Sequence, residues 1–255
     1  GHMGPLAGAY LPACSPGEMI NIMDRANVIM LCFCSHQALM VPAVGASGDI
    51  DAVLQYPERF KAYRGVVSRY LDPERDLAEM ERYPDVFVGF KFLADYYRIP
   101  ISDKRHDPYW EYADKHRLLV LVHTWGGSDY NCLRHAEEVL ERYPNLIFIA
   151  GHSFHGKWEG AVELAARYPN LYLELTAVLD DRGVLDYFVD KLGSERILFG
   201  TDLPWFATHH GIGAVMSADI TDDDRRNILY RNGKKLLERF PWFEEFWNKY
   251  GGGAF

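Results

Sequence analysis

The sequence predicts an α/β fold built on a parallel sheet, and its spacing favours a (β/α)8 TIM barrel. Short apolar runs alternate with longer segments of helical periodicity along the 255 residues, and crossovers of that length connect parallel strands. Polar residues follow seven of these runs and recur every 23 to 32 residues, whereas a barrel of this size allots roughly 31 residues to each strand–helix unit. A doubly wound sheet would give similar intervals, but it usually carries a glycine-rich phosphate loop, and no GxGxxG or Walker sequence occurs here.

The expected strands are short runs of apolar residues, which are typical of strands buried on both faces of a sheet. They lie at residues 28–34, 64–68, 86–92, 118–123, 146–150, 171–175 and 196–199. Capping residues mark the first helix, where Ser15 precedes Pro16 and Glu18 follows three residues after the serine. The expected helices span residues 15–27, 72–84, 107–115, 131–143, 157–168, 181–192 and 222–240. An eighth strand is not visible, so we expect the first strand of the barrel to be missing or truncated at the N-terminus.

Residues 1–255 are expected to form one barrel domain, because no linker or low-complexity segment interrupts the alternation. From about residue 241 the chain carries an aromatic extension. Its aromatic side chains would either pack across the bottom of the barrel or contact a second subunit, which makes a homodimer possible.

The composition argues against nucleic-acid and membrane partners and indicates the cellular compartment. The chain has 27 basic and 36 acidic residues and a net charge of −9, which disfavours nucleic-acid binding and attraction to an anionic membrane. No apolar stretch reaches the ~18 residues that a membrane span needs, and no signal peptide is recognisable. The four cysteines form no CxxC pair, so we expect a reducing, cytoplasmic setting.

Three polar residues at strand ends point to a metal site. His123, His152 and Asp202 each come just after a hydrophobic strand, and in a barrel the carboxyl ends of the strands carry the catalytic groups. Imidazole nitrogens and a carboxylate are ligands that zinc or manganese accepts. An open coordination position on such a metal would hold a water and lower its pKa toward ~7.

Several stretches resemble the amidohydrolase-related family, which includes aminocarboxymuconate-semialdehyde decarboxylase, resorcylate-type decarboxylases and carboxylate or lactone hydrolases. The similar stretches are VGFKF at 88–92, LVLVHT at 119–124, FIAGH at 148–152, ILFGTDLPW at 197–205 and NILYRN at 227–232. The resemblance runs from about residue 3 to residue 240 and implies a metal-dependent TIM barrel.

The resemblance also implies roles for individual residues. In the family an H-x-H pair after the first strand, a histidine after the fifth and an aspartate after the eighth hold the metal, which makes His123 and Asp202 ligands and His152 the group that acts on substrate or water. The sequence contains no H-x-H. His2 stands where the second histidine of that pair is expected, although Gly-His-Met is also a common remnant of tag cleavage.

The resulting prediction is a metal-dependent hydrolase of a small carboxylate, lactone or amide, with zinc as the expected metal and manganese as the alternative. Asp202 would accept the proton of the activated water, and His152 would stabilise the developing oxyanion. Candidate contacts to an acidic substrate are Lys91, Arg98, Trp125, Trp205 and His155. A nonoxidative decarboxylase of an aromatic or muconate-type acid is the first alternative, and a non-catalytic barrel with an incomplete metal site is the second.

Overall fold

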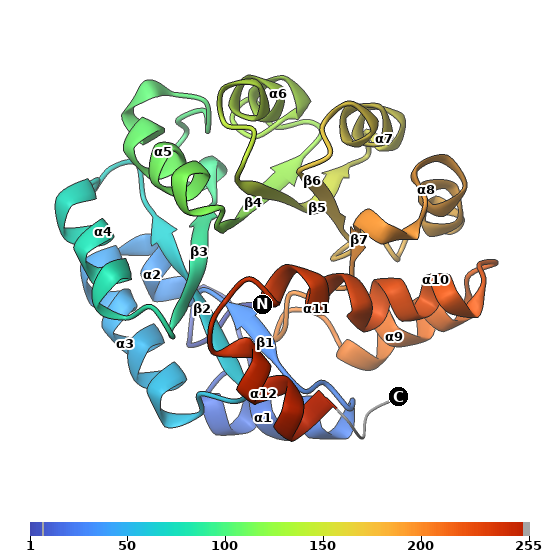
Figure 1. Ribbon diagram of the computed structural model, residues 1–255, viewed down its shortest axis with the longest axis horizontal. Coiled ribbons are helices and arrows are strands. Elements are labelled where there is room, and N and C mark those ends of the chain that lie inside the picture. Colours follow the sequence, from blue (N-terminus) through green and yellow to red (C-terminus); the bar gives the residue numbers. More distant parts are fainter. Residues whose placement is uncertain (7, 252–255) are drawn as a thin grey trace.

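A curled sheet of parallel strands forms the centre of the molecule. The computed structural model describes residues 1–6 and 8–251, and in this part of the chain the sheet has seven strands in the order β1-β2-β3-β4-β5-β6-β7. The strands are β1 (Leu31–Phe33), β2 (Phe60–Val66), β3 (Phe87–Phe92), β4 (Leu119–Trp125), β5 (Ile147–His155), β6 (Leu171–Glu174) and β7 (Ile197–Leu198). Each strand pairs in parallel with the next, and the helices surround the sheet (Figure 1).

The helices connect successive strands and cover the outside of the sheet. They are α1 (Pro16–Arg25), α2 (His36–Met40), α3 (Pro42–Gln55), α4 (Pro73–Arg82), α5 (Asp107–His116), α6 (Leu133–Arg142), α7 (Trp158–Arg167), α8 (Val184–Leu192), α9 (Thr208–Ser217), α10 (Asp222–Arg226), α11 (Asn232–Leu237) and α12 (Phe243–Tyr250). Short 3-10 turns η1 (Ala94–Tyr96), η2 (Lys104–His106) and η3 (Ser194–Arg196) and a π-helical segment η4 (Asn227–Arg231) complete the described elements. The predicted helices are present, whereas α2, α3, α9 and α12 were not expected.

The first residues of the chain lie between the two outer strands of the sheet. The Gly1 amino group donates to the Cys32 carbonyl at 3.1 Å, and the Cys34 amide donates back to the Gly1 carbonyl at 3.2 Å. On the other side, the His2 amide donates to the carbonyl of Leu203 at 2.7 Å. These residues therefore occupy the carboxyl-terminal end of the position where a first barrel strand would lie. In the described part of the chain no strand precedes β1, and the expectation of a barrel that lacks its first strand is confirmed.

A cavity of about 550 Å³ lies between β1 and β7, below these first residues. Apolar side chains line most of it, including Val28, Leu198 and Phe246. Lys91 and Asp202 line its polar end. The gap between β1 and β7 thus leaves an apolar space that reaches Lys91 and Asp202.

The aromatic extension packs against the barrel. Phe240 is buried in the interior cluster, and its ring stacks on Trp242 with centroids 5.6 Å apart. The Lys61 ammonium lies 4.1 Å from the centroid of Trp242, a cation–π contact. Phe243, Phe246 and Trp247 of α12 also line the cavity. The homodimer stays a prediction.

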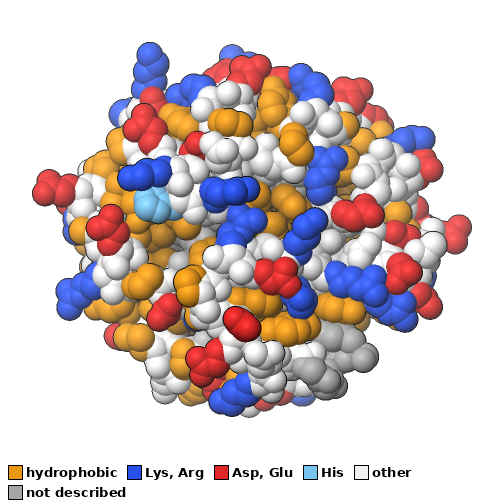
Figure 2. All heavy atoms as spheres, viewed as in Figure 1, with side chains coloured by type: hydrophobic (Ala, Val, Ile, Leu, Met, Phe, Trp, Pro, Cys, Tyr) orange, Lys and Arg blue, Asp and Glu red, His pale blue; other side chains and the backbone are white. Residues whose placement is uncertain are grey.

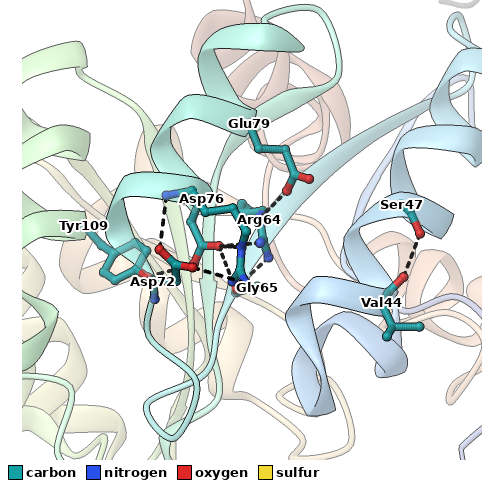
Figure 3. Close-up of polar contacts among 9 residues, drawn as sticks. Val44, Ser47, Arg64, Gly65, Asp72, Asp76, Glu79 and Tyr109 are labelled. Carbon is teal, nitrogen blue, oxygen red and sulfur yellow. Dashed lines mark hydrogen bonds and ion pairs between the residues drawn. The ribbon is translucent and has the colours of Figure 1, made fainter.

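A buried ionic cluster joins β2 to α4 and α5 (Figure 3). Arg64, which is 1% exposed, donates from Nη2 to the Asp76 carboxylate at 2.6 Å, and Glu79 lies 2.7 Å from its Nε. Tyr109 donates to the other oxygen of Asp76 at 2.8 Å. A buried guanidinium is tolerated only when it is paired in this way.

Asp49 on α3 is a second buried carboxyl near this cluster. It is 1% exposed and accepts the backbone N–H of Ser35 at 3.2 Å. Burial raises the pKa of Asp49 to about 7, against the lowering effect of Ser35 and Arg64.

Replacing Asp49 by asparagine is expected to flatten the pH dependence of stability. Between about pH 4 and pH 7 the folded chain retains a proton that the unfolded chain loses, so the stability falls as the pH rises. This group alone should lower the free energy of unfolding by roughly 1.4 kcal/mol per pH unit in that window. Urea unfolding of both proteins across the window measures it, with exposed Asp51→Asn as the control. A variant with the parent's slope would contradict the burial argument.

The surface shown in Figure 2 carries lysine, arginine and acidic side chains interspersed with apolar ones. Among the described residues, no helix combines the length and the apolar character that crossing a bilayer requires.

Candidate active site

A hydrogen bond between His123 on β4 and His152 on β5 links the two strands and determines which ring nitrogens carry hydrogens. His152 Nδ1 lies 3.1 Å from the carbonyl oxygen of Thr176, which only accepts, so this nitrogen carries a hydrogen. His152 Nε2 therefore has a lone pair when the ring is neutral, and it accepts from His123 Nδ1 at 3.0 Å. The outer nitrogen of His123, Nε2, is left with a lone pair that is free to bind a cation.

Burial favours the neutral form of both rings. Desolvation lowers the pKa of His123 well below its usual range, and the neighbouring His152 adds to this. Desolvation also lowers the pKa of His152, although Glu174 and Asp202 oppose it. Neutral rings are the form in which histidine binds metals.

His2 and Asp202 face each other on the opposite side of the site. His2 Nδ1 lies 2.8 Å from the Cys34 carbonyl and donates to it, so a neutral His2 presents a lone pair at Nε2. That atom lies 3.2 Å from Oδ1 of Asp202. Burial by itself would raise the pKa of Asp202, but His2, the N-terminal amino group and His152 together lower it well below its usual range.

This pair meets one requirement of a metal site. Two acceptor atoms that face each other at this distance need a cation between them, either a proton or a metal ion. Ligand atoms that each lie about 2.1 Å from a zinc ion in tetrahedral geometry are roughly 3.4 Å apart, so the separation fits. Within residues 1–6 and 8–251, however, no three His, Cys, Asp or Glu side chains are grouped closely enough to hold an ion. The donor chemistry of His2, His123 and Asp202 therefore fits a divalent metal, while only the His2–Asp202 pair is in contact.

Lys91 supplies a buried positive charge. It comes from β3, is 4% exposed and lines the cavity together with His152, Glu174 and Asp202. Desolvation lowers its pKa, while Asp202 and Glu174 raise it. In the part of the chain that the structure describes, no carboxylate lies within salt-bridge distance of Lys91, so its ammonium is available to an anionic ligand.

Aromatic rings form one wall beside the histidines. Trp125 stacks on His155 with centroids 4.1 Å apart and planes 9° apart. The ring of His123 is also nearly parallel to the indole, with centroids 6.0 Å apart and planes 7° apart. The indole is 37% exposed, so this flat surface is accessible to a planar ligand.

The backbone is strained at two of these positions. His152, Ser153 and Phe154 have φ of 68°, 48° and 55°, and Asp202 has φ of 51°. Non-glycine residues in this left-handed region are uncommon and cluster at functional sites, where surrounding contacts hold them.

The remaining predicted site residues are placed as follows. Trp205 donates from Nε1 to His36 Nε2 at 2.9 Å, and the ring of His36 stacks on His2 at 4.7 Å. Trp205 therefore supports the His2 side of the site. Arg98 follows η1 with an exposed side chain and does not line the cavity.

Sequence reasoning missed two acidic residues of the site. Asp95 accepts from Ser128 and Asn131, both at 2.6 Å, and lies 3.9 Å from His123 Nε2. Glu174 ends β6 and accepts the His152 amide at 3.2 Å. The available signal for Glu174 was a single acidic residue inside an otherwise apolar strand.

Comparison of the sequence with protein-family models shows which family the chain belongs to. A family model described as Amidohydrolase matches residues 16–239. The chain belongs to the amidohydrolase family. No curated protein sequence matches this amidohydrolase at a significant level.

Solved structures of similar fold include several decarboxylases. The 2,6-dihydroxybenzoate decarboxylase from Rhizobium shares 18% identity over 86% of this chain and 87% of its own, with a TM-score of 0.69. The 5-carboxyvanillate decarboxylase from Sphingomonas paucimobilis shares 15% identity over 92% and 87%, with a TM-score of 0.72. A dihydroxybenzoic acid decarboxylase from Polaromonas sp. JS666, with bound manganese and the inhibitor 2-nitroresorcinol, shares 17% identity over 86% and 85%, with a TM-score of 0.71. The family match and the similar structures identify this amidohydrolase as an enzyme with a TIM-barrel fold.

Proposed function

We propose that this amidohydrolase is a metal-dependent nonoxidative decarboxylase of a small aromatic acid. The observation that carries the proposal is the set of near-parallel rings that Trp125 forms with His123 and His155, with Trp125 partly exposed. A planar ring is the ligand that such a surface accommodates best. The decarboxylases among the similar structures, one of them with bound manganese, support this proposal over the hydrolase.

The buried charge of Lys91 supports an acidic substrate. An ammonium that is 4% exposed and lines the cavity with Asp202 and His152 would bind a carboxylate or phenolate oxygen by a charge-assisted hydrogen bond. His2, His123 and Asp202 would hold the metal. Zinc and manganese both suit these ligands, and the metal would supply positive charge that orients the acidic oxygens of the substrate.

His152 is then the group that moves the proton. It is the ring next to the wall that is not assigned to the metal, and its Nε2 is the nitrogen with a lone pair. To carry a proton there, His152 would exchange its hydrogen bond with His123 for one to the substrate, and it would then place the proton on the ring carbon that bears the carboxylate. The bond from that carbon to the carboxylate then breaks, its electron pair restores the aromatic ring, and CO2 leaves. One proton is consumed and no redox partner is needed.

Product analysis tests the proposal. The protein, loaded with manganese or zinc, is incubated in D2O with hydroxybenzoates labelled with 13C in the carboxyl group. We expect labelled CO2 and a product with one deuterium at the carbon that carried the carboxylate. Asp202→Asn is the matched inactive control. Turnover of lactones or amides without CO2 release would establish the hydrolase instead.

A further inference from the structure

The turn that carries His152 needs outside support. His152, Ser153 and Phe154 are three consecutive non-glycine residues in the left-handed region, a conformation that an isolated chain would leave. One support comes from β4, where Thr124 Oγ1 accepts the Phe154 amide at 2.9 Å.

The larger share of the support comes from Glu174. Its Oε2 accepts the His152 amide at 3.2 Å, and its carbonyl accepts the hydroxyl of Ser153 at 2.9 Å. Its Oε1 accepts the Thr176 amide at 3.1 Å and also the Thr176 hydroxyl. Since the Thr176 carbonyl in turn receives His152 Nδ1–H at 3.1 Å, Glu174 contacts both the backbone of His152 and the group that fixes its ring.

Gly200 provides the space for this carboxylate. A Cβ built on Gly200 would lie 1.5 Å from Glu174 Oε1 and 3.0 Å from Thr176 Oγ1. Gly200 is not among the glycines with positive φ, so its backbone conformation is open to other residues. The absence of a side chain is therefore what this position requires.

We propose that Glu174, seated against Gly200, is a positioning residue that holds His152 in its left-handed turn with the hydrogen on Nδ1. The ring then presents the Nε2 lone pair to His123 Nδ1 at 3.0 Å, which leaves His123 Nε2 free. The contribution of Glu174 to turnover rests on the proposed role of His152, whereas its effect on the two rings does not.

Two single substitutions with different chemistry should give the same defect. Glu174→Gln keeps the size of the side chain but turns one acceptor into a donor, and Gly200→Ala displaces the carboxylate by contact. Both should lower kcat by about 10- to 100-fold with KM changed by less than about threefold, as expected for loss of an orienting partner. Because both substitutions act through one carboxylate, the kcat of the double variant Glu174→Gln/Gly200→Ala should be no lower than that of the less active single variant.

The direct readout is the tautomer of the rings, measured by 15N NMR on protein labelled in histidine. The parent should show His152 with its hydrogen on Nδ1, and both variants should show a mixed or exchanging tautomer. Glu163→Gln, on the exposed face of α7, and Gly213→Ala, which has nothing within 4 Å of the new Cβ, are the matched controls.

A compensating pair keeps the test decisive if a single variant folds poorly. The shorter side chain of Glu174→Asp leaves room for a methyl group, so Glu174→Asp combined with Gly200→Ala should recover part of the tautomer signal that Gly200→Ala loses. A parent-like tautomer in folded Glu174→Gln, or no recovery in the compensating pair, would overturn the proposal. Absence of decarboxylation in the parent protein, with the NMR results as expected, would overturn the proposed function alone.

Discussion

Asp202→Asn is expected to remove stoichiometric metal binding and to lower turnover by more than about 100-fold. The carboxylate Oδ1 lies 3.2 Å from His2 Nε2, and a cation between these atoms needs the negative charge to balance its own. Asparagine keeps the shape but is neutral and can direct an amide N–H at the lone pair of His2. Without the negative charge of Asp202, the pair would no longer attract a cation.

Elemental analysis of the purified variant, before and after addition of manganese or zinc, measures this outcome. Asp190→Asn is the matched control, because Asp190 has 68% of its side chain exposed and forms an ion pair with the adjacent Lys191. Circular dichroism establishes that both variants are folded. A variant that retains one metal per chain and turnover within a few-fold of the parent would show that Asp202 is not a ligand.

His152→Gln is expected to lower kcat by about 10²- to 10⁴-fold, the usual contribution of a positioned proton donor or acceptor. The metal content should stay at the parent's level, because His152 is 6% exposed and contacts the proposed ligand set only through His123 Nδ1. Loss of turnover without loss of metal would separate the proton-transfer role from the ligand role.

Rapid-quench measurement of CO2 release, with metal content determined on the same samples, checks this prediction. His116→Gln is the control, since His116 is exposed at the end of α5. If His152→Gln released CO2 at nearly the parent rate, another group would have to deliver the proton. If it lost the metal instead, His152 would belong to the metal site.

The apolar runs predicted β3 and β4 well, whereas the run at 28–34 forms a strand only over Leu31–Phe33. For β2 the predicted start at residue 64 was late, because the strand begins at Phe60 and includes Lys61 and Arg64. Both charges are tolerated only through distant partners: Lys61 donates to the Asp85 carbonyl at 2.6 Å, and Arg64 pairs with Asp76. Local sequence carries no information about such partners.

The helices α2 and α3 were missed for a related reason. The segment between β1 and β2 contains Pro42, Gly45 and Gly48, which are poor helix formers. A Cβ on Gly45 would come within 2.0 Å of the Ala38 amide, so this glycine permits α3 to pack closely against α2. Packing therefore overrides propensity in this segment.

The sequence by itself determined the parallel α/β barrel, the missing first strand and the strand ends at which Lys91, His123, His152 and Asp202 lie. These features are local, because an apolar run and the polar residue that follows it specify a buried strand and its carboxyl end. Only the tertiary structure decided how the side chains are used. Three contacts join residues from different parts of the chain. His2 faces Asp202, His123 shares a hydrogen bond with His152, and Glu174 supports the turn at His152. Ring tautomers and pKa values depend on those neighbours, so no spacing rule could supply them.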